Sequence, residues 1–182
     1  MTLSIKEIGA IAPIGFFHLT FQLTRTLKEL PETSFLLGET SFAKVKMGYD
    51  EMGLQVCISM KSLFQEKDRI HLFVDTRDVK EKGIPHRYCH HFLISREGGE
   101  EITHFRGEEV RKIAEPFSVL CKGKSIEVEL NDLYGFNPNE CHRIGFTYLI
   151  ELENGQKQHF AISSKDYTIK QHPDLWATGV LI

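Results

Sequence analysis

The sequence has a single tryptophan, no closely spaced pair of cysteines and no long block of charge of one sign. The four cysteines (Cys57, Cys89, Cys121 and Cys141) are widely separated and form no CxxC pair, which argues against a zinc ribbon. A chain of 182 residues can bury a core without a disulfide framework, so we expect buried, reduced thiols.

Charge and hydropathy argue against two further classes of protein. The formal net charge of −3 does not favour a nucleic-acid-binding surface. The apolar segment 8–21 is interrupted by Pro13 and Gly15 and is preceded only by Lys6 as a basic residue, so it predicts neither a signal peptide nor a transmembrane segment. We interpret it as an early strand and expect a cytoplasmic protein, while export without a leader peptide stays open.

Helical periodicity is scarce, and the dominant period is two. Segments 108–115 and 131–134 have room for two helical turns and one, too few to organise a core. The segment 126–130 (IEVEL) instead alternates apolar and acidic residues, as a half-buried strand does. Turn signals at 48–53 and at Asn154-Gly155 predict hairpins. The other segments that we predict as strands are 43–47, 54–60, 70–75, 144–150, 158–163 and 176–182.

Many short strands separated by turn residues predict an all-β fold. We expect a single antiparallel β-sandwich of the jelly-roll kind with little helix, which occupies residues 1–182 as one domain.

Ionisable residues of both signs crowd the segments 75–78 (DTRD) and 86–92 (HRYCHHF). Successive side chains of a strand point to opposite faces, so Cys89 and His91 share one face while His90 lies on the other. These three residues therefore cannot close one tetrahedral zinc site. The simpler interpretation of His90 is a histidine at the edge of the core with a satisfied ring N–H.

Two further chemistries are weaker alternatives to ion pairing in this region. Asp68, Asp75 and Asp78 are candidate calcium ligands, but their spacing lacks a compact Asp-rich loop. Pairing of His91 with Asp75 or Cys89 would suggest acid–base or nucleophilic catalysis, yet no third orienting group and no catalytic motif accompanies either pair. We therefore expect no enzyme.

A binding face is the alternative that we favour. With Ile70, Leu72 and Val74 directed to the core, His71, Phe73 and Asp75 would point outward, beside Arg87, Cys89 and His91 on the adjacent strand. Asp75 and Arg87 on one face would offer charge-assisted hydrogen bonds to a hydroxyl-rich or anionic ligand. An ion-paired outer face without a ligand is the competing interpretation.

Five segments, in order along the chain, resemble sandwich domains of the family 9 carbohydrate-binding modules and of DOMON domains. The likeness covers residues from about 40 to the end of the chain. The segments are 49–54, then 70–78 (IHLFVDTRD) with 87–92 (RYCHHF), 126–130 with 133–138 (LYGFNP), 143–148 (RIGFTY) and 172–178 (HPDLWAT).

The resemblance implies a non-catalytic binding module with carbohydrate as the leading ligand class. Family 9 modules hold a sugar between aromatic rings, typically tryptophans, and can carry calcium. Trp176 is expected in the core, so the candidate stacking rings are Tyr49, Phe64, Phe73 and Tyr134. Some DOMON relatives bind haem through Met and His, for which Met47, Met52, Met60 and nine histidines are available.

The resemblance and the binding-face argument together select six ligand-binding candidates. These are Asp75, Arg77, Arg87, His90, His91 and Phe73. No cofactor is expected, with calcium and haem as alternatives, and no metal ligand is assigned. The alternative functions are a protein-interaction or assembly scaffold without a small-molecule ligand and, third, a haem- or metal-binding sandwich.

Overall fold

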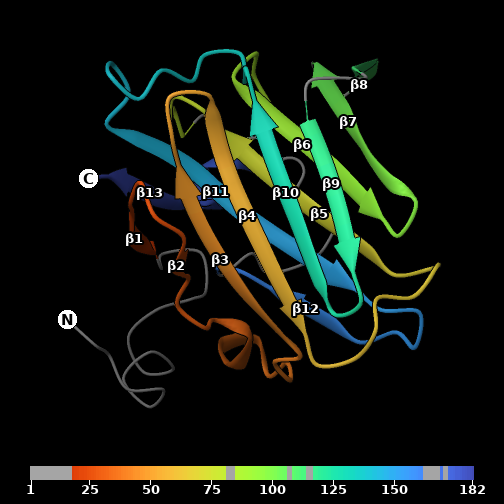
Figure 1. The fold of residues 1–182 in the computed structure, drawn as a ribbon. Coiled ribbons are helices and arrows are strands. Elements are labelled where there is room, and N and C mark those ends of the chain that lie inside the picture. The colour runs from red at the N-terminus through yellow and green to blue at the C-terminus, as the bar shows by residue number, and fades with distance from the viewer. Residues whose placement is uncertain (1–17, 81–84, 106–107, 114–116, 162–168, 170–171) are drawn as a thin grey trace.

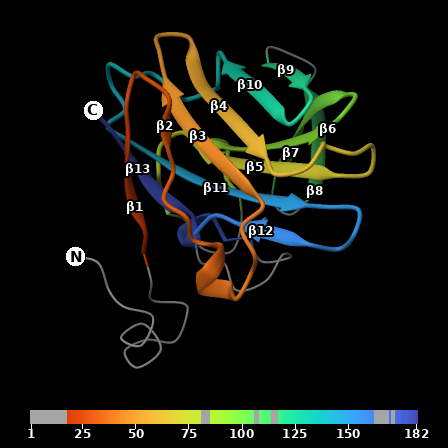
Figure 2. The ribbon, with the colours of Figure 1, turned by 60° about the horizontal axis from the view of Figure 1, so that its bottom comes forward.

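Two β-sheets pack face to face (Figure 1), and Figure 2 shows them as two layers. The computed structural model describes residues 18–80, 85–105, 108–113, 117–161, 169 and 172–182. The eight-stranded sheet has the order β1 (Thr20–Leu23), β13 (Ala177–Leu181), β11 (Arg143–Glu151), β5 (Arg69–Asp75), β6 (Cys89–Ser95), β7 (Gly98–Phe105) and β8 (Glu108–Ile113), and β12 (Lys157–His159) also pairs with β11. The five-stranded sheet has the order β2 (Lys28–Glu29), β3 (Ala43–Tyr49), β4 (Gly53–Met60), β10 (Ser125–Asn131) and β9 (Phe117–Lys122).

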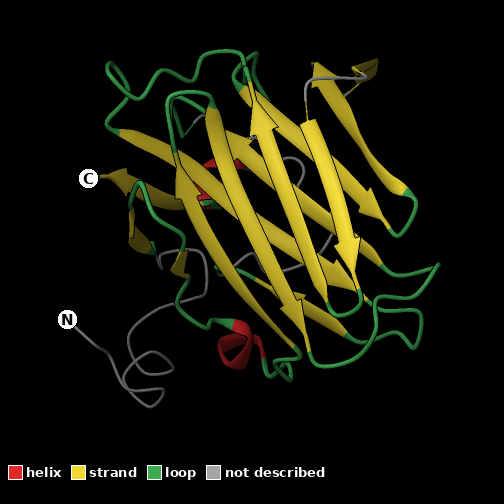
Figure 3. Ribbon diagram, in the orientation of Figure 1, coloured by secondary structure: helices red, strands yellow, loops and turns green. Residues whose placement is uncertain are grey.

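The main core fills the space between the sheets, and strand alternation supplies it. Ile70, Leu72 and Val74 of β5 belong to this core, as do Ile126 and Val128 of β10. Burial of one such side chain contributes about 1.5–3 kcal/mol. The expected all-β sandwich is confirmed, and its strand pairs are antiparallel except for β1 with β13, which is parallel. The helical elements of the described chain are the short 3₁₀ turns η2 (Ser34–Leu37) and η3 (Pro173–Leu175) (Figure 3).

Local expectations fail at three places, and a fourth lies mostly outside the described residues. The segment 108–115, expected as helix, forms strand β8 up to Ile113, and after Asn131 ends β10 the expected helical turn is replaced by tighter turns. The strand expected over 158–163 already ends at His159. Of the early strand expected over 8–21, residues 8–17 lie outside the described residues, and β1 begins at Thr20. In the described part of the chain, no helix is long and apolar enough to cross a membrane.

Gln158 links the two sheets through a fully buried side chain. Its Oε1 accepts hydrogen bonds from the backbone N–H groups of Phe42 (2.8 Å) and Ala43 (2.9 Å). Its Nε2 donates to the carbonyl of Ala43 (2.9 Å) and to the hydroxyl of Tyr148 (3.0 Å). All four hydrogen-bonding positions of the amide are therefore used, as a buried polar group requires.

Tyr148 makes the stability of the fold sensitive to alkaline pH. Burial raises the pKa of Tyr148 to about 12, against 10.0 for the free side chain. Between these values the unfolded chain loses the phenolic proton while the native chain retains it, so stability falls as the pH rises. We expect a loss of about 1.4 kcal/mol by pH 11 from this group, measured by urea unfolding at pH 9 and pH 11.

Tyr148→Phe should flatten this pH dependence, although the variant is less stable at neutral pH because it lacks the hydroxyl that Gln158 contacts. Tyr134→Phe is the matched control, because Tyr134 is 59% exposed and its variant should keep the wild-type slope. Equal slopes for Tyr148→Phe and the wild type would contradict the assignment.

Candidate functional site

Asp75 ends β5 with a completely buried carboxylate. Oδ1 accepts a hydrogen bond from the backbone N–H of Arg77 (3.0 Å), and Oδ2 accepts one from that of Val79 (2.8 Å). His86 Nε2 lies 3.2 Å from Oδ2. With its hydrogen on Nε2, the His86 ring donates to Asp75 and accepts at Nδ1 from the backbone N–H of Tyr88 (3.3 Å). The Asp75 carboxylate is therefore bonded to residues near both ends of the β5–β6 connection.

Thr76 and His90 hold the turn that follows β10. Thr76 donates through Oγ1 to the carbonyl of Tyr134 (2.8 Å), and Nε2 of His90 lies 3.0 Å from the same oxygen. The other ring nitrogen of His90 lies 2.6 Å from the carboxylate of Glu101. Both partners of His90 are oxygen acceptors, so a proton must be held between His90 and Glu101 for both contacts to be hydrogen bonds.

Gly135 permits the close approach of this turn to the β5–β6 connection. Its φ is +84°, and the backbone N–H of Phe136 bonds to the carbonyl of Leu133 (3.0 Å) to close the turn. A Cβ at position 135 would lie 2.5 Å from the Tyr88 ring and 2.7 Å from Thr76 Oγ1. Only glycine therefore lets the Tyr88 ring and this turn pack together.

These supports present a group that we call the aromatic platform: the exposed Arg77, Arg87 and Tyr134 together with the half-buried Tyr88. The two tyrosine rings stack with centroids 5.7 Å apart and an interplanar angle of 12°. The guanidinium carbons of Arg87 and Arg77 lie 4.8 Å and 5.8 Å from the centroid of the Tyr88 ring, and Arg87 donates to the Tyr88 hydroxyl (2.8 Å). Both arginines are exposed, and Arg77 also pairs with Glu140 at 3.8 Å.

The outer face of β5 and β6, expected to be open, is covered. The Phe73 ring stacks on that of His91 with centroids 4.3 Å apart and contacts Trp176 at 5.6 Å. These three residues are 2–3% exposed, and Trp176 donates its indole N–H to the carbonyl of Ile169 (2.8 Å). The prediction that Trp176 is buried is thus confirmed, but it belongs to a second, smaller cluster outside the main core.

The six predicted site residues are therefore divided among different surroundings. Arg77 and Arg87 reach the surface together, whereas Asp75 is buried, so Asp75 and Arg87 do not line one open face. His90 contacts Glu101, and Phe73 and His91 lie under Trp176. Ligand binding by these residues stays a prediction.

The structure also bears on the zinc, calcium and catalytic alternatives for this region. Strand alternation does separate His90, which stacks on Phe92, from His91, which stacks on Phe73. The three candidate calcium ligands do not gather, because Asp68 lies before β5 and accepts from the backbone of Gln65 and Glu153, whereas Asp75 lies at the far end of that strand. The imidazole in contact with Asp75 is that of His86.

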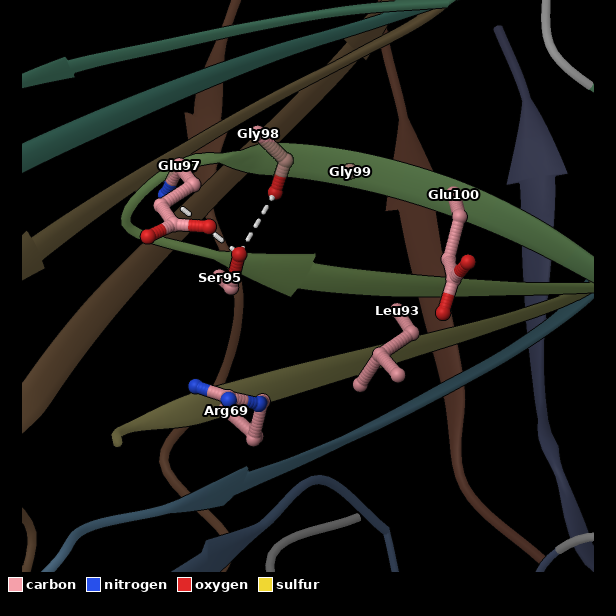
Figure 4. Close-up of a pocket in the computed structure, with 7 residues that line it drawn as sticks. All are labelled: Arg69, Leu93, Ser95, Glu97, Gly98, Gly99 and Glu100. Atoms are coloured by element: carbon pink, nitrogen blue, oxygen red, sulfur yellow. Dashed lines mark hydrogen bonds between the residues drawn. The ribbon is translucent and has the colours of Figure 1, made fainter. Parts of the chain in front are cut away.

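A groove of about 350 Å³ lies at the opposite end of β5 and β6, beside the β6–β7 hairpin (Figure 4). Arg69, Ser95, Glu97 and Glu100 supply polar groups, and Leu93 supplies the apolar part of its lining. The space beside Gly98 (φ +141°) is open, since a Cβ there would meet no atom of the described chain within 4 Å. None of the seven lining residues found in the described part of the chain is aromatic.

Sequence reasoning missed Tyr88 and the groove. Tyr88 follows Arg87 within the segment that was singled out, but its ring partner Tyr134 comes from a distant part of the chain. The signal that was available is the Tyr134-Gly135 pair, because a glycine after an aromatic residue at a turn allows a close approach from another segment. The groove lies beside the β6–β7 hairpin, which the alternation did not reveal.

The fold is that of a family 9 carbohydrate-binding module-like sandwich. Two solved structures are similar to it: a family 9 carbohydrate-binding module from Caldicellulosiruptor kristjanssonii in complex with cellotriose, and one from the same organism in complex with glucose. The TM-score is 0.60 and the sequence identity 12% for both. The matches cover 89% and 90% of this chain and 93% and 95% of the neighbours.

At this identity the likeness concerns the fold alone. No family model matches the sequence, and no curated protein is similar to it. The likeness to DOMON domains stays a prediction.

Asp75→Asn tests whether the buried carboxylate organises this end of the sheet. The asparagine amide retains one acceptor oxygen, but its NH₂ group replaces the other oxygen and faces a backbone N–H or the His86 ring. At least one buried N–H donor is then left without an acceptor. We expect a loss of about 3 kcal/mol in the free energy of unfolding, measured by urea titration.

Asp50→Asn is the matched control. Asp50 also binds two backbone N–H groups of a turn, those of Met52 (2.8 Å) and Gly53 (3.0 Å), but it is only half-buried. Water can replace lost contacts there, so we expect a loss of about 1 kcal/mol. A loss at Asp75 no larger than at Asp50 would contradict the organising role.

Proposed function

We propose that the protein is a non-catalytic carbohydrate-binding module whose sugar rests on the aromatic platform. The observation that carries the proposal is the exposed Tyr134 ring, stacked on Tyr88 and accompanied by the guanidinium groups of Arg77 and Arg87. The neighbouring structures with cellotriose and glucose support the choice of ligand class.

The chemistry of the platform matches that of a pyranose. The C–H face of a sugar ring is apolar and packs on an aromatic face, while its hydroxyl groups need directional polar partners. Arg77 and Arg87 are hydrogen-bond donors, and the carboxylate of Glu140, 3.8 Å from Arg77, is an acceptor. Because the Tyr134 ring is stacked on Tyr88 and its backbone is held by Thr76 and His90, the ring loses little freedom when a ligand binds.

Binding on the platform is favoured over binding in the groove. Arg69, the guanidinium of the groove, already donates to the backbone carbonyls of Glu66 (2.6 Å) and Asp68 (2.8 Å). The residues found to line the groove in the described part of the chain include no aromatic ring on which a sugar could pack. A function as an interaction scaffold stays a prediction.

Tyr134→Ala should weaken sugar binding about tenfold or more, because truncation of a central aromatic contact commonly costs over 1 kcal/mol. Titration calorimetry with glucose and cellotriose measures the change. Since the Tyr134 backbone makes the supporting hydrogen bonds, the variant should keep its fold, which circular dichroism and urea unfolding check.

Leu120→Ala is a matched control, because Leu120 is an exposed apolar residue (45%) on β9 of the other sheet. Its variant should bind sugar as the wild type does, and so should Glu97→Gln in the groove. Wild-type affinity in Tyr134→Ala, or no binding of any sugar in a broad glycan screen, would refute the proposal.

A further inference from the structure

Three side chains with different metal-ligand atoms meet at the start of β6. Asp75 and Cys89 are directly paired across β5 and β6, so their side chains share one face of the sheet. The backbone N–H of Cys89 donates to the carbonyl of His86 (2.9 Å), and this turn folds the imidazole back toward Asp75. One ligand atom from each of Asp75, His86 and Cys89 lies within 4.8 Å of the other two.

We propose that Asp75, His86 and Cys89 bind a zinc ion, a function independent of carbohydrate binding. Zinc accepts carboxylate oxygen, imidazole nitrogen and thiolate sulfur, whereas calcium and magnesium prefer oxygen alone. In a tetrahedral site with bonds of 2.0–2.3 Å, the ligand atoms lie about 3.3–3.8 Å apart. The three ligand atoms therefore need to approach one another by at most about 1.5 Å.

One of the ligands, Asp75, is already oriented for this role. The backbone N–H groups of Arg77 and Val79 fix the carboxylate of Asp75, as outer-shell hydrogen bonds do for ligands in metal sites. Among the contacts of the described chain, His86 is the one side chain at hydrogen-bond distance from this wholly buried carboxylate. A divalent ion would supply the positive charge that a buried carboxylate requires.

Zinc coordination would shift one proton and remove another, and it would leave the fourth position of the tetrahedral site for a further ligand. His86 would bind through Nε2 and move its proton to Nδ1, which gives up the long (3.3 Å) hydrogen bond from the Tyr88 N–H. Cys89 would lose its thiol proton to solvent, because the thiolate is the ligand. A water molecule would be the fourth ligand; a cavity of about 10 Å³ beside Cys89, lined also by Phe73, Trp176 and four other residues, is close to the space that one water molecule needs.

Cobalt(II) substitution tests the proposal on the full chain after metal has been removed with a chelator. One equivalent of Co²⁺ should produce a thiolate-to-cobalt charge-transfer band and the visible bands of tetrahedral cobalt. Zn²⁺ should abolish both, and Ca²⁺ should not. Cys89→Ser should lose the charge-transfer band, and His86→Gln should lower the affinity for Zn²⁺ by at least about tenfold.

Cys141→Ser is the matched control, because Cys141 is as buried as Cys89 (4% and 7% exposed) but lies outside the cluster. It should bind Co²⁺ as the wild type does. A zinc-edge X-ray absorption spectrum of the wild-type protein tests the site without any variant, and should show one sulfur neighbour at about 2.3 Å with nitrogen and oxygen neighbours. Absence of the charge-transfer band or of the sulfur neighbour, or a charge-transfer band that persists in Cys89→Ser, would overturn the proposal.

Discussion

The complete burial of the Asp75 carboxylate constrains everything at this end of the molecule. A buried carboxylate is tolerated only with donors around it, and here the donors are two backbone N–H groups of the following loop and the ring of His86. The connection from β5 to β6 is therefore anchored at its beginning and near its end. Arg87, which is exposed, and Tyr88, which is half-buried, hold a defined position because the residues on either side of them are hydrogen-bonded.

The same principle places Tyr134. Its backbone carbonyl accepts from Thr76 and His90, both of which are buried, while its ring faces the solvent. Thr76 and His90 could have contacted a ligand, but they instead fix the backbone that presents the Tyr134 ring. Trp176 covers the outer face of β5 and β6. The exposed polar and aromatic groups therefore lie in the loops at one end of β5 and in the groove at its other end, about 20 Å away.

Period-two alternation was sufficient to predict the sandwich, because strands such as β5 and β10 bury every second residue in the main core. It failed for β8, whose sequence EEVRKI is rich in charge, a property of edge strands that resembles an exposed helix. The candidate site was predicted only in part. Asp75 and Arg87 were both selected as candidate ligand contacts, but alternation does not reveal that one supports a loop while the other is exposed on it. The stacking of Tyr88 on Tyr134 depends on tertiary structure and on the space left by Gly135.

The proposed zinc ligands and the platform share one short segment, in which His86 and Cys89 turn inward and Arg87 and Tyr88 lie between them. An ion bound to the inward pair would also change the hydrogen bond between the Tyr88 N–H and His86, and with it the freedom of the Tyr88 ring. Any effect of zinc on sugar affinity must then be matched by an equal effect of sugar on zinc affinity, since coupling between two binding sites is reciprocal. If the two affinities proved independent, the carbonyl of Tyr88, which accepts from the Thr76 N–H (3.0 Å), would suffice to hold the platform in place without the ion.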